Sequence, residues 1–326
     1  MEYEFYIKGH IDIAWEDWFE DFSLNHLPDG NTRLQGQVAD QPMLQSILLQ
    51  FSKLGLTLLK VEKIKERSIK MDEIHVVLGA SGGVGHAVAS RLAKQGKPVR
   101  AVNRSGRIPG LPDGVQLSPA DVLDVEEAIN ACEGASVVYH CVHPKEDYSQ
   151  LPRMTENIVA GAQASGARLI MAASVYPYGI VDRPMTENMP YKPEAPSGEF
   201  HAQAADIVMK AHEDGRVQAS IGRASNYFGP FAPRLWPGID FRQAVAGEKM
   251  QIIGKTQPLH TYTYVYDFAD GLITLGKNDR ALGEVWHLPS AETISTQEFL
   301  DLIYKEAGTE PDVQIGPKLV LQIMGI

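Results

Sequence analysis

The chain has 326 residues, of which 44% are apolar and 22% charged, a balance typical of a folded protein of about two domains. Asp and Glu number 41 against 30 Lys and Arg, and the net charge of −11 argues against a nucleic acid or an anionic membrane as the main partner. Only two cysteines are present, which excludes a disulfide scaffold or a four-cysteine zinc site. The first residues lack a signal-peptide pattern and no apolar run approaches the ~18 residues of a membrane span, so we expect a cytoplasmic protein.

Residues 1–65 are expected to form a small domain of their own. The pattern predicts, in chain order, a strand with alternating Tyr3, Phe5 and Ile7, a helix with Trp15, Trp18 and Phe19 on one face, a hairpin turn at 28–31, a helix capped by Asp40 and a strand at 57–64. This βαββαβ order indicates a ferredoxin-like sandwich. Its aromatic residues have core spacing, and the domain would act as a sensing or oligomerisation module.

A charged linker at 66–72 leads into a second domain at 73–326. Apolar strands are predicted at 74–78, 98–103, 136–142, 168–173 and 217–222, and helices at 84–95, 124–132, 150–165 and 199–213. Alternating strands and helices indicate an α/β fold, a Rossmann doubly wound parallel sheet. We expect a small C-terminal substrate lobe built mainly from 175–198 and 229–326, and the apolar end at 317–326 suggests a shortened chain with an apolar patch for a partner, possible in a homodimer.

The turn after the first of these strands carries the clearest signal for a ligand. Gly79, Gly82 and Gly85 stand in a GxxGxxG spacing between a strand and a helix. Gly79 would allow the tight turn, Gly82 the close approach of a pyrophosphate, and Gly85 close packing of helix on strand. With Ser81, Gly83 and Val84 they would bind a dinucleotide at the N-terminus of the helix.

The end of the second strand bears on which dinucleotide is bound. An acidic residue usually stands here in a protein that selects NAD, where it holds the ribose 2′-hydroxyl. This chain has Asn103, Arg104 and Ser105 instead, whose donors suit a 2′-phosphate. We therefore predict NADP in preference to NAD, with a solvated loop charge as the alternative for Arg104.

Two other motifs overlap these segments. Gly79, Ser81 and Gly83 also match the G-x-S-x-G of a hydrolase nucleophile elbow, but the glycine spacing already explains the turn. The segment His140-Cys141-Val142-His143 ends a strand and contains three soft metal ligands. No further ligand is marked, so we predict no metal, and we expect Cys141 and His143 on one face, lining the cofactor cleft.

Five segments form a recognisable set: VVLGASGGVG at 76–85, ADV at 120–122, ASVYPYG at 173–179, NYFGP at 226–230 and YVYDFA at 264–269. Over about residues 73–326 the chain resembles the extended short-chain dehydrogenase/reductases, the NAD-dependent epimerase/dehydratase family. The resemblance implies that Asp121, with Val122 beside it, contacts adenine. It also implies that Ser174 hydrogen-bonds the substrate oxygen and that the Asn226 segment flanks the nicotinamide and substrate.

The family's catalytic pair is a Tyr and a Lys at i and i+4 on one helix face, where the ammonium lowers the tyrosine pKa. No tyrosine in this chain has a lysine four residues later. Counting from Ser174 places the pair near Glu199 and Gln203, which cannot supply that chemistry. The chain therefore lacks the pair.

Three explanations stay open. Tyr176, Tyr178 or His201 could donate the proton instead; the protein could bind the dinucleotide as a sensor without turnover; or the reaction could need no strong acid. We predict an NAD(P)-binding atypical oxidoreductase or epimerase-like enzyme that acts on a small carbonyl or sugar-like molecule. A non-catalytic, dinucleotide-binding redox sensor is the alternative.

Overall fold

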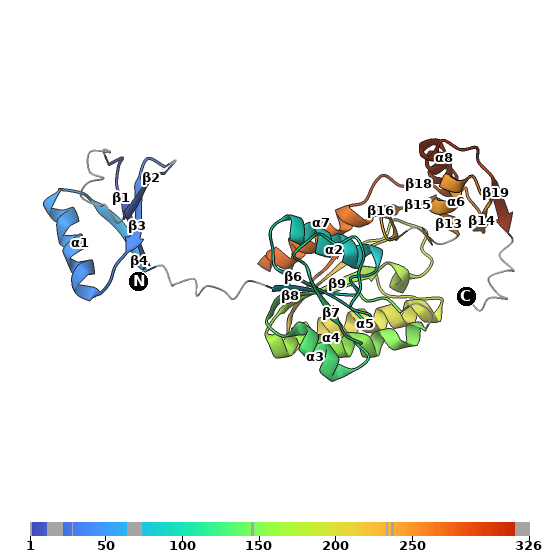
Figure 1. Cartoon of the computed structure of the whole chain (residues 1–326), viewed down its shortest axis with the longest axis horizontal. Helices are drawn as coiled ribbons and strands as arrows, with labels where there is room; N and C mark the ends of the chain where they lie inside the picture. Colours follow the sequence, from blue (N-terminus) through green and yellow to red (C-terminus); the bar gives the residue numbers. More distant parts are fainter. Residues whose placement is uncertain are drawn as a thin grey trace. The chain divides into compact units, whose positions relative to one another are not determined.

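The computed structural model describes residues 2–11, 22–27, 29–63, 74–144, 147–232, 234–235 and 238–316. The chain divides into two compact units, residues 1–72 and 73–326 (Figure 1). The expected helix around Trp15, the whole linker at 66–72 and the apolar end at 317–326 lie outside the described residues. Within the described ranges, no helix has the length and apolar character needed to cross a bilayer.

The first unit is an antiparallel four-stranded sheet with one helix in its described residues. Its elements are β1 (Glu2–Ile7), β2 (Phe22–His26), β3 (Thr32–Gln37), α1 (Gln41–Lys53) and β4 (Leu58–Lys63). The strand order is β2-β3-β1-β4, and every neighbouring pair is antiparallel. The predicted strands, the hairpin and the helix after Asp40 are confirmed. The first helix is not among the described residues, so the ferredoxin-like sandwich stays a prediction.

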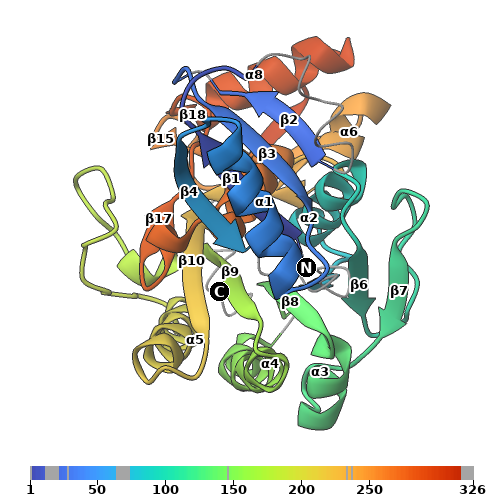
Figure 2. The same cartoon turned by 90° about the vertical axis from the view of Figure 1, so that its left-hand side faces the viewer.

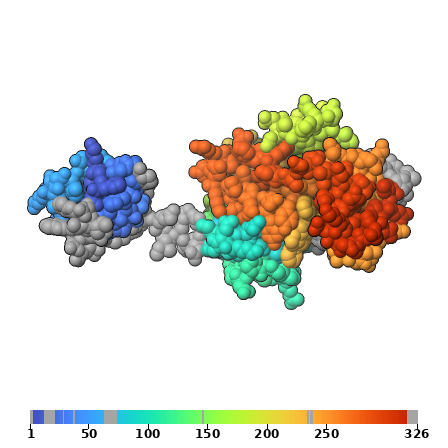
Figure 3. Space-filling model, turned by 90° about the horizontal axis from the view of Figure 1, so that it is seen from above, coloured from blue at the N-terminus to red at the C-terminus, as the bar shows by residue number. Residues whose placement is uncertain are grey.

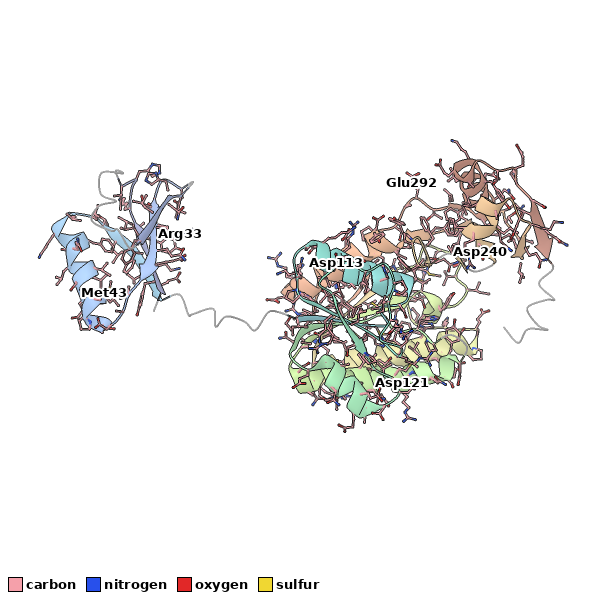
Figure 4. The ribbon with its side chains drawn as sticks, viewed as in Figure 1. Arg33, Met43, Asp113, Asp121, Asp240 and Glu292 are labelled. Carbon is pink, nitrogen blue, oxygen red and sulfur yellow. The ribbon has the colours of Figure 1, made fainter. Side chains whose placement is uncertain are left out.

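Side-chain alternation gives this sheet one apolar face. Phe5 and Ile7 are fully buried in the core, where Phe51 of α1 meets Phe5 edge to face. Glu4 and Arg33 form an ion pair of 3.5 Å between β1 and β3, and Figure 4 labels Arg33 on the side of the sheet away from α1. The Asp40 side chain accepts a hydrogen bond from the Met43 N–H and so begins α1 as the sequence predicts.

The second unit is built on a parallel sheet of seven strands. These are β5 (Ile74–Leu78), β6 (Val99–Asn103), β7 (Gln116–Pro119), β8 (Ala135–His140), β9 (Arg168–Ser174), β10 (Gln218–Ala224) and β17 (Val285–His287). Their order is β17-β10-β9-β8-β5-β6-β7, and all pairs are parallel (Figure 2). The Rossmann-like α/β fold is thus confirmed, and two short strands, β7 and β17, add edges that the apolar pattern did not predict.

Helices cover both faces of this sheet. One face carries α3 (Val125–Cys132), α4 (Leu151–Ser165) and α5 (Pro196–Glu213), and the other carries α2 (Gly83–Lys94) and α7 (Val265–Lys277), as Figure 1 shows. The buried strand side chains separate accordingly into two apolar cores, one on each face. Because both faces are covered, the strands read as nearly continuous apolar runs.

A smaller lobe follows the sheet in sequence and closes over a core of its own. Its elements are β11 (Asn226–Phe228), β12 (Arg234–Leu235), β13 (Ile239–Asp240), α6 (Phe241–Ala246), β14 (Met250–Ile253), β15 (Leu259–His260), β16 (Tyr262–Tyr264), β18 (Ile294–Ser295), α8 (Thr296–Ala307) and β19 (Val313–Gly316). The rings of Tyr262 and Phe299 stack at 3.9 Å in its core. In Figure 3 the later part of this lobe, in red, forms one end of the surface of the second unit.

Candidate functional site

The strand order reverses between β5 and β8. From β5 the chain proceeds through β6 and β7 toward one edge, whereas β8, β9 and β10 proceed toward the other. In such sheets ligands bind beyond the carboxyl ends of the strands at this switch point. Here the backbones of Gly79 and Cys141, one residue past β5 and β8, meet so closely that a Cβ on Gly79 would lie 2.5 Å from the Cys141 carbonyl oxygen.

The glycine turn has the shape that a pyrophosphate requires. Gly79 has a φ of +81°, which an L side chain rarely adopts. A Cβ on Gly85 would overlap the Gly79 carbonyl oxygen and lie 2.9 Å from Ala80 Cα, so this glycine lets α2 pack on the turn. Gly82 is exposed, and a Cβ there would meet only the Gly79 oxygen at 3.6 Å. The turn is closed on its protein side and open at Gly82.

The N-terminus of α2 adds donors to this opening. Gly82 is the N-cap residue, and no side chain caps the helix there. The first amide N–H groups of α2, from Gly83 and Val84 onward, are therefore available to an anion, with the positive end of the helix dipole behind them. Ser81 is exposed beside them. These residues fit the phosphates of a dinucleotide.

The segment after β6 is organised by its own side chains. Asn103 Nδ2 donates to the Arg107 carbonyl oxygen at 3.0 Å, and the Ser105 hydroxyl lies within 3.4 Å of the same oxygen and of Asn103 Oδ1. Both residues therefore shape the loop. Arg104 is exposed and, among the described residues, is held by no ion pair or hydrogen bond. The sequence prediction grouped all three as phosphate donors, but the loop geometry separates Arg104 from the other two.

Arg104 and Asp121 line one open pocket although 17 positions separate them in the sequence. The pocket lies between the ends of β6 and β7 and the helix α3, and its lining also includes Glu127. Asp121 Oδ1 accepts a hydrogen bond from the Leu123 N–H, and Glu127 accepts one from the Asp121 N–H at 2.7 Å. Figure 4 labels Asp121 in this part of the second unit. Val122, the next residue, is buried in the core beneath it.

The segment after β8 lies on the other side of the switch point. β8 ends at His140, so Cys141 and His143 lie beyond the strand and the expected alternation along it does not apply to them. Cys141 is half-buried, and burial raises its pKa to about 12, so the thiol is inert at neutral pH. His140 is fully buried, its Nε2 lies 3.0 Å from the Thr155 hydroxyl, and burial lowers its pKa to about 4. In the part of the chain that is described, no group of three His, Cys, Asp or Glu side chains could hold a metal ion.

The segment after β9 separates the two candidate proton donors. The Tyr176 N–H donates to Ser174 Oγ at 3.4 Å, and 41% of the Tyr176 side chain is exposed. Tyr178 is only 1% exposed, and its hydroxyl lies 2.9 Å from His287 Nε2. The pKa of both tyrosines is raised, chiefly by desolvation. Only Tyr176 combines a position beside Ser174 with an accessible ring.

The helix α5 shows which residues face this edge of the sheet. Glu199 and Gln203, the positions that counting from Ser174 assigned to the catalytic pair, are both exposed. The inward i, i+4 pair is Ser197, half-buried, and His201, 6% exposed. The helix begins against the Tyr176 backbone, since a Cβ on Gly198 would lie 3.0 Å from the Tyr176 carbonyl oxygen.

Four rings meet where β8, β9 and α5 converge, and we name them the aromatic wall: His143, Tyr148, Tyr176 and His201. The His201 ring lies 5.6 to 5.8 Å from each of the other three, and His143 lies 5.1 Å from Tyr148. Burial lowers the pKa of His143, and it lowers that of His201 to about 4, with His143 and Arg223 contributing. At neutral pH the wall therefore carries no charge.

A buried arginine lies behind the wall. Arg223, at the end of β10, has no exposed surface, donates from Nη2 to the Tyr191 hydroxyl at 2.6 Å, and lies 4.8 to 5.0 Å from the Tyr191 and Tyr178 rings. Glu187 accepts a hydrogen bond from the His287 N–H at 3.0 Å. These contacts hold the loop between Tyr178 and Tyr191 against the sheet. Sequence reasoning missed Arg223, because a single arginine in an apolar strand has no spacing signal.

The last segment of the site connects the sheet to the smaller lobe. Asn226 begins β11, which pairs in parallel with β16, where Asn226 is opposite Tyr262. The neighbouring Tyr227 donates from its hydroxyl to the Ala173 carbonyl oxygen at 2.6 Å. This bond places the Asn226 segment beside the end of β9, where Ser174 stands. Five segments distant in sequence therefore converge at one edge of the sheet.

A parallel α/β sheet with a glycine turn at its switch point defines a dinucleotide-binding protein. The model of the NAD dependent epimerase/dehydratase family matches residues 75–288, about two thirds of the chain, and the chain belongs to this family. Nicotinamide dinucleotide is therefore its cofactor, and its class is that of the family's oxidoreductases. Residues 2–62 match a domain of unknown function, DUF8691.

The relatives are distant. A dTDP-6-deoxy-L-talose 4-dehydrogenase (NAD(P)(+)) of Kitasatospora kifunensis is 25% identical over 257 residues, 73% of this chain and 80% of that protein. The bovine sterol-4-alpha-carboxylate 3-dehydrogenase, decarboxylating, is 27% identical over 70% of this chain and 68% of that protein. The chain spans 42% of a 3beta-hydroxysteroid-dehydrogenase/decarboxylase of Arabidopsis thaliana, at 26% identity.

Solved structures agree in fold. A dTDP-glucose 4,6-dehydratase from Bacillus anthracis in complex with NAD has a TM-score of 0.67 at 16% identity, covering 75% of this chain and 84% of that one. A UDP-glucuronic acid 4-epimerase from Bacillus cereus in complex with NAD has a TM-score of 0.64 at 17% identity, covering 75% and 87%. At these identities the likeness shows the fold alone.

Proposed function

We propose that the protein is an NADPH-dependent reductase of a small carbonyl compound, in which Tyr176 takes the place of the family's Tyr–Lys pair. The observation that carries the proposal is the position of Tyr176, an exposed residue whose backbone N–H donates to Ser174 Oγ at the switch-point edge. Ser174 would hold the substrate oxygen by a hydrogen bond. Tyr176 would donate the proton to that oxygen.

In the proposed reaction each group has its own role. When bound, the nicotinamide supplies the hydride. The Ser174 hydroxyl orients the carbonyl carbon toward it, and the Tyr176 hydroxyl neutralises the charge that develops on oxygen. Desolvation keeps the pKa of Tyr176 above its usual value, so this residue holds its proton at neutral pH. Reduction therefore needs no nearby lysine, whereas oxidation would.

The preference for NADPH rests on Arg104. It is one of two exposed arginines in the loop that follows β6, and it lines one pocket with Asp121, which would contact the adenine. A guanidinium at this place would bind a 2′-phosphate by charge-assisted hydrogen bonds. Asn103 and Ser105 would hold the loop in shape around it.

A second candidate is a dinucleotide sensor without turnover. It is favoured by one feature of α5: its inward-facing pair contains His201, whose pKa of about 4 leaves it neutral, so no cation on this face lowers the pKa of Tyr176. In this alternative the first unit would relay the redox state. We propose for that unit a ferredoxin-like sandwich, and for the whole chain a cytoplasmic location and assembly as a homodimer.

Calorimetric titration with NADPH and NADH, followed by a panel of aldehydes and ketones with NADPH, tests the proposal. We expect at least tenfold tighter binding of NADPH, about 1.4 kcal/mol, and consumption of NADPH with one or more carbonyls. Binding without any turnover, together with a change in assembly, would favour the sensor. Failure to bind either dinucleotide would overturn both candidates.

A further inference from the structure

The aromatic wall supplies a surface for substrate that differs from the surface a nucleotide sugar needs. The His201 ring lies 5.6 to 5.8 Å from the other three rings, and the backbone N–H of Tyr176 donates to Ser174 Oγ. His143 and Tyr176 are exposed and Tyr148 is half-buried, so the wall presents ring surface to the space beyond the sheet edge. Flat ring surface of this kind binds apolar bodies by area and dispersion.

The charged side chains near the wall also bear on the kind of substrate. A sugar nucleotide carries a diphosphate, which proteins hold with arginine or lysine. The arginine nearest the wall, Arg223, has no exposed surface and is enclosed by two tyrosine rings. In the smaller lobe, Arg242 is bound by two hydrogen bonds, of 3.0 and 2.8 Å, to Asp240. Arg223 is therefore closed to a phosphate by burial, whereas Arg242 keeps an exposed side chain in its ion pair with Asp240.

Within the described residues, buried nitrogens without a hydrogen-bond partner lie in and behind the wall: His201 Nε2, and Nε and Nη1 of Arg223. His201 Nε2 is buried and makes no hydrogen bond to the described residues. A buried nitrogen without a partner costs free energy, and a ligand oxygen or hydroxyl placed there would satisfy it. Pockets for small molecules have this composition, with mostly apolar walls and a few placed polar groups.

From these contacts, and on the basis of the proposed function, we infer that the substrate is an uncharged carbonyl compound with an apolar body that lies on the aromatic wall. The carbonyl oxygen would meet Ser174 and Tyr176, while the body would cover His143 and Tyr148. Substrate specificity would therefore depend on how much ring surface of the wall the substrate covers. The smaller lobe would form the opposite side of the substrate site.

The test is direct binding to the NADPH-loaded chain by calorimetry, with 1-decalone, an uncharged bicyclic ketone, and UDP-glucose as probes. We expect decalone to bind at least tenfold more tightly than UDP-glucose. Tyr148→Ala should weaken decalone binding at least tenfold and leave NADPH binding unchanged, whereas Tyr148→Phe, which keeps the ring, should bind decalone as the wild type does. His201→Phe, which keeps a ring and removes Nε2, would report the contribution of that nitrogen.

The outcomes separate the two proposals. Tighter binding of UDP-glucose, or no binding of decalone to the NADPH-loaded protein, would overturn the inference about substrate and leave the dinucleotide site standing. Equal loss with Tyr148→Ala and Tyr148→Phe would overturn the role of the ring. Decalone is also titrated without NADPH, so that a failure of NADPH binding, which would overturn the proposed function, still leaves the aromatic wall tested by its own ligand.

Discussion

The glycine turn after β5 and the helix α5 reach the same carboxyl edge of the sheet. The turn keeps the glycine motif of the family, whereas α5 lacks the family's Tyr–Lys pair. In the turn, Gly79 and Gly85 have no room for a Cβ, and Gly82 stays open. On α5 the inward pair is Ser197 and His201, which replaces a phenol and an ammonium with a hydroxyl and a neutral ring. Backbone packing leaves no alternative to glycine at Gly79 and Gly85, whereas the pair on α5 is held by side-chain contacts, those of His201 with the aromatic wall.

This contrast has a physical reason. A substitution in the turn would break the fold and the cofactor site together, because the same atoms serve both. A substitution on α5 changes only what the helix presents to the ligand, since small buried residues such as Ala204 and Ala205 pack it on the sheet. Cofactor binding and proton transfer are therefore separable in this fold.

The largest effect is expected at the turn. Gly85→Val would place a Cβ against the Gly79 carbonyl oxygen and Ala80 Cα, which cannot move without opening the turn. We expect loss of measurable NADPH binding and a fall in Tm of several degrees. Calorimetry and thermal unfolding of the same preparations measure both.

Gly82→Ala is the matched control, because its Cβ would meet only one oxygen at 3.6 Å. It should keep the wild-type Tm and lose at least tenfold in NADPH affinity, since the methyl group would occupy the approach of the pyrophosphate. If Gly82→Ala bound NADPH like the wild type, the open side of the turn would not be the phosphate site.

Tyr176 and Tyr178 offer the next comparison. Tyr176→Phe should lower turnover by a factor of about 100 or more, the usual contribution of a positioned proton donor, and leave stability nearly unchanged because Phe keeps the ring contact with His201. Tyr178→Phe should do the opposite, keeping turnover and losing about 1 kcal/mol of stability with the bond to His287. Steady-state kinetics measure the turnover of the two variants, and urea unfolding measures their stability. Full turnover in Tyr176→Phe would remove this residue from the reaction.

These positions also show how far the sequence could predict the site. The glycine spacing between an apolar strand and a helix was enough to predict the turn, because the backbone geometry there requires glycine. The inward face of α5 could not be counted from Ser174, because the loop between them has no fixed length. Arg223 and Tyr148 gave no signal, since their neighbours are distant in sequence and only the fold brings them to the wall. Asp121 was found through the family's motif alone.

The pH dependence of the two reaction directions tests the state of Tyr176. Because its pKa is raised, the protonated form dominates below pH 10, so carbonyl reduction should change little between pH 6 and 9. Alcohol oxidation needs the phenolate and should rise about tenfold per pH unit over the same range. A reduction rate that falls steeply between pH 7 and 9 would indicate a donor with a lower pKa.

Two buried histidines predict a loss of stability in mild acid. The pKa of both His140 and His201 is lowered to about 4 in the folded chain, against about 6.5 unfolded. Between these values the unfolded state binds more protons, so this stability is complete above pH 6.5 and is lost as the pH falls toward 4. From pH 7.5 to 5.5 we expect a loss of roughly 1 kcal/mol for each histidine.

Urea titrations followed by circular dichroism measure this loss, because most of the helix in the described residues belongs to the second unit. His201→Gln removes one titrating group and should reduce the difference between the two pH values by about half of the histidine contribution. An unchanged difference in the variant would mean that carboxylates, and not the wall, govern the pH dependence.

The smallest expected effect separates the two ends of the cofactor site. Arg104→Met should weaken NADPH binding about tenfold, or about 1.4 kcal/mol, and leave NADH binding as it is, because the guanidinium would contact only the 2′-phosphate. Arg107→Met is the matched control, since this second exposed arginine belongs to the same loop but does not line the pocket with Asp121. An equal loss of NADPH affinity in the two variants would indicate that the positive charge of the whole loop attracts the cofactor. At a high salt concentration, which screens exposed charges, NADPH affinity should still fall only in Arg104→Met. That result would show that the loop after β6 selects the cofactor. This loop lies far along the sheet edge from the residues of α5 that decide the reaction.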